Sequence, residues 1–162
     1  MSLRTQRFAA ALLAAGACAA TAGTVNVSFV NADTYWDAGW PSWDQGANLK
    51  RLSGHLEQLG GQLLPQDQVL SVDVLQVDLA RTVRVASTAR VMNGGADWPR
   101  LLLRYRLEAP GRAPLSGEEW VSDQNYLRGM TSYGDSGPLF YERRMLTRWF
   151  KARFAEGVAA PG

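Results

Sequence analysis

A two-residue repeat of apolar and polar side chains predicts strands in four parts of the chain. The segments are 24–30 (TVNVSFV), 67–83 (DQVLSVDVLQVDLARTV), 98–109 (WPRLLLRYRLEA) and 118–129 (EEWVSDQNYLRG). The segment at 67–83 is apolar on both faces, which is typical of a strand in the interior of a sheet. Strict alternation along it predicts two sets of side chains on opposite faces: Val72, Val74, Gln76 and Asp78 on one, and Asp73, Leu75, Val77 and Leu79 on the other.

The segment at 98–109 separates apolar from basic side chains more cleanly, which predicts a half-buried antiparallel strand with a basic outer face. The apolar set is Leu101, Leu103, Tyr105 and Leu107, and the opposite set is Arg100, Leu102, Arg104 and Arg106.

Spacings of three and four residues between apolar side chains predict two helices. The first covers about 46–61, with a stripe of Leu49, Leu52, Leu56 and Leu59, and Gly60-Gly61 is expected to end it. The second covers 138–154, with Pro138 at its first position. Its apolar face consists of Leu139, Leu146, Trp149, Phe150 and Phe154. The order of elements predicts an α+β two-layer sandwich, in which two helices pack on one face of a mainly antiparallel sheet of about four strands.

The first 22 residues have the composition of a secretory signal peptide. Arg4 and Arg7 precede an alanine-rich apolar run, and Ala20-Thr21-Ala22 supplies the small residues of a cleavage site. The run is too short for a good membrane span. We therefore expect a signal peptide at 1–22, a single domain at 23–162 with a frayed tail from about 155, and a periplasmic or secreted location.

Cys18 offers an alternative to simple cleavage. The stretch AAGAC resembles the lipobox of bacterial lipoproteins, although Ala15 stands where a leucine is usual. Association with the membrane is expected only if Cys18 is lipidated. If cleavage follows Ala22 instead, the mature chain has no cysteine, which excludes disulfides and Cys-ligated zinc.

Export also changes the charge of the protein. The whole chain has 17 basic and 15 acidic residues, and removal of Arg4 and Arg7 leaves 15 of each. A near-neutral mature chain without a basic run is not expected to bind nucleic acid. The glycine-rich stretch at 129–138 lacks the lysine of a P-loop, and no cofactor is expected.

The most promising binding segment is the aromatic loop YWDAGWPSW. Its side chains Tyr35, Trp36, Trp40 and Trp43 can stack on sugar rings or clamp a peptide. The alternative is that the loop folds back and its tryptophans plug the open end of the sheet. We favour this alternative, because buried aromatic side chains supply much of the core of so small a domain.

The second candidate is the polar segment around Asp123. Alternation places Asp123 and Asn125 on one face, where they could ligate a hard metal or orient a water, with Asp78 on a neighbouring strand. The alternative, which we favour, is a structural polar network in which Asp123 pairs with a cross-strand arginine. Its members would be Asp78, Arg104, Arg106, Asp123 and Asn125.

His55 is the only histidine, at the edge of the leucine stripe. A single histidine excludes a His-rich zinc site, and no G-x-S-x-G segment accompanies it. We expect a surface or core-edge residue rather than a catalytic base.

Four blocks of the chain together resemble one bacterial family. They are VDVLQVDLA, DWPRLLLRYRL, SDQNYL and LFYERRMLTRWF, and their order and spacing over about residues 25–154 are similar to those of the domain of unknown function 3016. The resemblance implies an exported bacterial protein without an assigned activity, so it transfers no catalytic residue.

These observations predict a non-enzymatic binding or accessory domain of the cell envelope, with an envelope protein or a glycan as its partner. The alternative is a small hydrolase or metal-dependent enzyme that uses Asp123 and Asn125 with Asp78.

Overall fold

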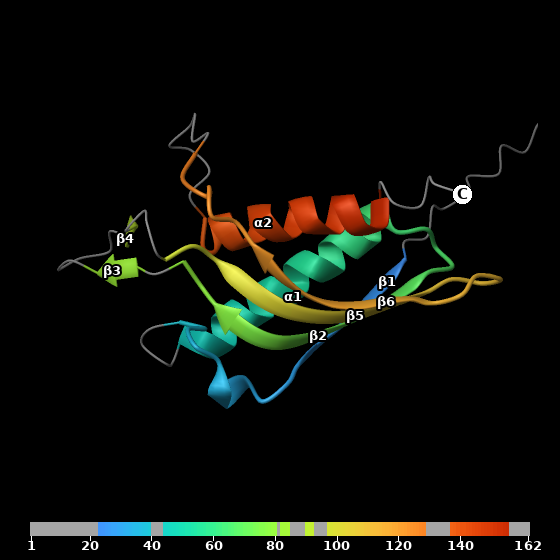
Figure 1. Cartoon of the computed structure of the whole chain (residues 1–162), viewed down its shortest axis with the longest axis horizontal. Coiled ribbons are helices and arrows are strands. Elements are labelled where there is room, and N and C mark those ends of the chain that lie inside the picture. The colour runs from blue at the N-terminus through green and yellow to red at the C-terminus, as the bar shows by residue number, and fades with distance from the viewer. Residues whose placement is uncertain are drawn as a thin grey trace, which may run out of the picture.

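The computed structural model describes residues 23–39, 44–80, 82–84, 90–92, 97–128 and 137–155 (Figure 1). The predicted signal peptide, Cys18, Trp40, Trp43 and the glycine-rich loop at 129–136 lie outside the described residues.

Four strands form one mixed sheet in the order β1-β2-β5-β6. They are β1 (Thr24–Phe29), β2 (Val69–Asp78), β5 (Arg100–Glu108) and β6 (Leu115–Ser122). Strand β1 pairs with β2 in parallel, whereas the β2–β5 and β5–β6 pairs are antiparallel. A separate two-stranded ladder joins β3 (Thr82–Arg84) to β4 (Arg90–Met92). The mainly antiparallel sheet that the sequence predicted is thus confirmed, with one parallel pair added.

Two helices lie on one side of this sheet (Figure 1). Helix α1 (Asp44–Leu63) crosses over from β1 to β2, and α2 (Phe140–Phe150) continues into a π-helical turn, η2 (Lys151–Ala155). A short 3₁₀ turn, η1 (Ala32–Thr34), follows β1. This arrangement confirms the α+β fold with both helices on one face.

The core lies between the helices and the inward side chains of the sheet. Strand β5 shows the predicted alternation, since Leu101, Leu103, Tyr105 and Leu107 are buried. The helices contribute the predicted stripes: Leu52, Leu56 and Leu59 from α1, and Leu146, Phe150 and Phe154 from the α2 segment. We call the opposite side the open face, because no helix of the described chain covers it.

A β-bulge in β2 overturns the predicted assignment of its faces. The register with β5 shifts between Val74 and Gln76, so one extra residue enters β2. As a result Val77 joins Val72 and Val74 in the core, while Gln76 lies opposite Leu102. Strict alternation had placed Asp73 and Asp78 on opposite faces. The bulge brings both to the open face, opposite Arg104 and Arg100 respectively.

Gly60 does not end helix α1, contrary to the sequence prediction, because the helix continues to Leu63. Gly60 instead lies against β1. A Cβ atom at this position would overlap Val25 Cγ2 and lie 3.2 Å from Val25 Cβ. The missing side chain therefore sets how closely α1 packs on the sheet.

Helix α2 also begins later than predicted. Leu139 has a φ of 58°, in the left-handed region, and helical geometry starts at Phe140. The buried side of α2 includes Glu142, which is fully buried and accepts a hydrogen bond of 3.0 Å from the Ala80 backbone. The helix is thereby tied to the end of β2.

Two glycines of α1 provide a matched test of this packing. We expect Gly60→Ala to lower the free energy of unfolding by about 2 kcal/mol, because the stiff Val25 side chain cannot move aside. Gly54→Ala in the same helix should raise it by about 1 kcal/mol, since alanine favours helix and its Cβ would meet no atom within 4 Å. Urea unfolding measures both, and two changes of the same sign would contradict this account.

Candidate binding surface

Two exposed tryptophans stack on each other over the open face. Trp36, from the loop after β1, is 59% exposed, and Trp120, on β6, is 45% exposed. Their ring centroids are 5.5 Å apart with an interplanar angle of 22°. Large apolar side chains that remain exposed together mark a binding surface more often than isolated ones do.

Arg100, on strand β5, contacts both rings. The Arg100 guanidinium lies 4.7 Å from the Trp36 ring centroid and 5.8 Å from that of Trp120. Its Nε donates a 2.8 Å hydrogen bond to Asp78 Oδ2, and Gln76 Oε1 accepts a 2.8 Å bond from the Trp36 backbone. We call Trp36, Gln76, Asp78, Arg100 and Trp120 the aromatic patch. Cation–π and ion-pair contacts hold its side chains together.

The predicted loop residues divide between the core and the surface. Tyr35 packs against the core, and its hydroxyl donates a 2.7 Å hydrogen bond to the Val74 carbonyl. Burial raises the pKa of Tyr35 to about 12, with a smaller opposing effect of the Val30 backbone, so the hydroxyl stays protonated at neutral pH. Tyr35 is thus an anchor that places Trp36 on the open face. The binding role of this loop stays a prediction.

Asp123 lies at the end of β6 and points toward the helices. It is only 7% exposed, and Oδ2 accepts a 2.8 Å bond from Arg148, with Arg144 at 3.5 Å. Its Oδ1 accepts a 3.2 Å bond from the Asn125 backbone. Arg144 also donates to the Tyr126 carbonyl. The carboxylate therefore joins the turn after β6 to helix α2.

Arg104 and Arg106 were predicted to pair with Asp123. This prediction is wrong, because both arginines lie on the other face of the sheet. Arg104 pairs with Glu118 at 2.9 Å, and Arg106 with Glu108 at 2.8 Å. The sequence predicted a strand that includes Asp123 and Asn125, but β6 ends at Ser122. The chain turns after that residue, so the alternation of a strand does not place Asp123 and Asn125 on one face.

The acidic site of the enzymatic alternative is not assembled. Asp78 lies on the open face with Arg100, whereas Asp123 lies on the helix side with Arg148. Asn125 is exposed in the turn. Among the described residues, no group of three or more His, Cys, Asp or Glu side chains could hold a metal ion.

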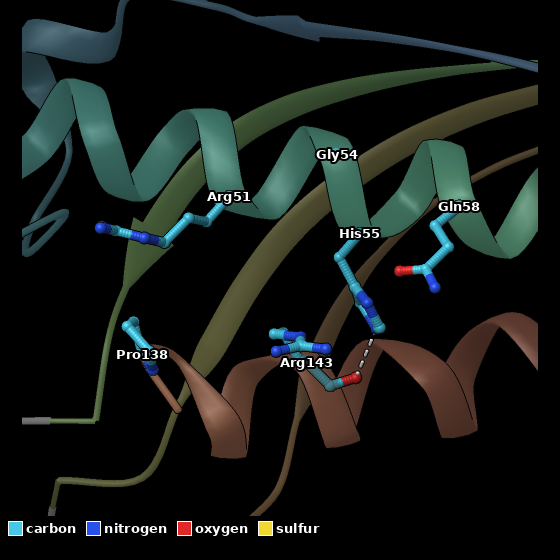
Figure 2. A pocket seen from close by; sticks show the side chains of 6 residues that line it. All are labelled: Arg51, Gly54, His55, Gln58, Pro138 and Arg143. Atoms are coloured by element: carbon cyan, nitrogen blue, oxygen red, sulfur yellow. Dashed lines mark hydrogen bonds between the residues drawn. The ribbon is translucent and has the colours of Figure 1, made fainter. Parts of the chain in front are cut away.

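His55 lies between the helices, at a shallow groove shown in Figure 2. Its Nε2 is 2.9 Å from both the Arg143 carbonyl and Thr147 Oγ1. Burial lowers the pKa of His55 below its usual range, a bond to the Arg143 backbone partly offsets this, and the Arg143 charge lowers it further. The core-edge position matches the sequence prediction.

Sequence reasoning missed Trp120 and Arg100 as partners of the aromatic loop. The two residues lie on strands whose order and register are not visible in a periodic pattern. The sequence did contain one signal: alternation along each strand places Arg100 and Trp120 on the face opposite the buried side chains.

The link through Asp123 can be tested without removing its turn. Asp123→Asn keeps the acceptor for the Asn125 backbone but loses the charge that pairs with Arg148 and Arg144. We expect the free energy of unfolding to fall by about 1–2 kcal/mol, the range of a charge-assisted hydrogen bond that is partly open to water. Glu118→Gln, in the exposed pair with Arg104, should change it by less than about 0.5 kcal/mol. If both variants change the free energy of unfolding equally in urea, Asp123 contributes no more to stability than the exposed Glu118 does.

Comparison with known proteins assigns the chain to a family. No curated protein and no solved structure matched. Within the described residues, no helix is long and apolar enough to cross a membrane. The family model described as "Protein of unknown function (DUF3016)" matches residues 23–152, which is most of the chain. The chain therefore belongs to the DUF3016 family.

Proposed function

We propose that this protein is an exported, non-enzymatic domain of the bacterial cell envelope that binds a glycan through the aromatic patch. The observation that carries the proposal is the exposed Trp36–Trp120 stack, held over Arg100.

The chemistry of the patch suits a sugar. The apolar face of a pyranose ring packs on an indole, while its hydroxyls need donors and acceptors at the edge of that ring. The Arg100–Asp78 ion pair supplies both beside the tryptophans, with side-chain exposures of 39% and 25%. Because these groups are already ordered, binding loses little side-chain entropy.

The shape of the site favours a polymer over a small buried ligand. The patch lies on the open face of the sheet, where it can contact successive units of a chain but cannot enclose one. Peptidoglycan, the polymer of the bacterial envelope, is a glycan of this extended form.

Two features support export. The first 22 residues carry the basic start, apolar run and A-x-A end of a signal peptide. The family match begins at Gly23, the residue after the expected cleavage point.

Co-sedimentation with purified peptidoglycan tests the binding proposal. We expect Trp36→Ala and Trp120→Ala each to weaken binding at least tenfold, because each removes one ring of the stack. A loss of about 1.4 kcal/mol corresponds to that factor.

Two variants control for general effects. Leu115→Ala removes another exposed apolar side chain of β6, and Arg106→Gln removes another open-face arginine. Both should bind as the unmodified protein does. If the two tryptophan variants bind peptidoglycan as tightly as the unmodified protein, the glycan proposal is wrong. It is also wrong if the protein binds only an envelope protein.

The mature N-terminus tests export separately. Mass spectrometry of the protein from the periplasmic fraction should give a chain that begins at Gly23. A chain that begins at a diacylated Cys18 would instead place it among the lipoproteins, and an uncleaved chain in the cytoplasm would overturn export.

A further inference from the structure

The groove between α1 and α2 is basic, and no acidic side chain is among the described residues that line it. Its volume is about 330 Å³, and it is lined by Arg51, Gly54, His55, Gln58, Pro138 and Arg143 (Figure 2). On this measure one water molecule needs about 10–15 Å³, so the groove has room for a phosphate or a small organic acid.

The two arginines of the groove have no carboxylate partner in the described chain. Arg51 donates only to the neutral Asn48 amide, at 3.1 Å, and Arg143 is exposed. Six other arginines do pair with carboxylates: Arg100, Arg104, Arg106, Arg144, Arg148 and Arg153. Both guanidiniums therefore keep N–H donors that no described carboxylate accepts.

The other residues that line the groove leave space for an anion. Gly54 sits within α1, where glycine costs about 1 kcal/mol relative to alanine, yet a Cβ there would meet no atom within 4 Å. Packing within the chain therefore does not require the glycine. His55 lies beside this space, and its Nδ1 is buried without a hydrogen-bond partner.

We propose that the α1–α2 groove binds an oxyanion, the phosphate or carboxylate group of a small molecule, between Arg51 and Arg143. This site lies on the helix layer and is separate from the aromatic patch. A variant that loses anion binding should therefore still bind the glycan, and the reverse, so the two proposals can be tested independently.

The single histidine of the chain provides a direct probe. The charged groups on the groove are Arg51 of its own helix and Arg143 of α2, while Thr147 offers only a hydroxyl. An anion between the arginines offsets their charge and favours protonated His55. Titration with inorganic pyrophosphate, and separately with citrate, at constant ionic strength should give a saturable shift of the His55 imidazole proton signals and raise its pKa.

Three variants identify the groove as the source of that shift. Arg143→Gln removes a donor, and Gly54→Leu fills the groove without changing the charge, so each should weaken binding at least tenfold. Arg112→Gln removes an exposed arginine in the β5–β6 turn and should bind normally. Circular dichroism checks that each variant folds. If Gly54→Leu unfolds, the comparison of Arg143→Gln with Arg112→Gln decides.

Two results would overturn the proposal. One is the absence of a saturable shift with either anion at millimolar concentration. The other is equal affinity in Arg143→Gln and Arg112→Gln, which would mean that the anions respond only to net charge.

Discussion

The close approach of helix α1 to strand β1 at Gly60 governs the positions of the other elements. Strands β1 and β2 are parallel neighbours, so the chain between them must cross one face of the sheet, and α1 is that crossing. A side chain at Gly60 would push the helix away from Val25. Once α1 covers this face, α2 packs beside it through His55 and Thr147, and the opposite face stays open.

One extra residue in β2 then determines what the open face can do. Without the bulge between Val74 and Gln76, Asp78 would point into the apolar core. With it, the carboxylate meets Arg100, and Gln76 meets the Trp36 backbone. The same shift returns Val77 to the core, so the core loses no apolar side chain. Bulges are known to redirect side chains in this way near functional sites.

The sequence allowed the fold class, the family and most core residues to be predicted, because burial leaves a periodic signal in β5, α1 and α2. It did not allow the bulge to be found, because inserting one residue makes an apolar strand look apolar on both sides. The partners of Asp123 were missed for a related reason: β6 ends at Ser122, and the arginines that reach the carboxylate come from a helix far along the chain. Trp36 was found from local composition, whereas Trp120 and Arg100 join it only through strand order.

The Trp36–Trp120 stack spans the sheet from the β1 side to the β6 edge, over the two strands between them. It therefore forms only when all four strands are paired in the correct register. A chain with a missing or slipped strand carries the same tryptophans but cannot bring them together. The patch thus exists only in the completely assembled protein, and a partner that recognises it would ignore partly folded copies.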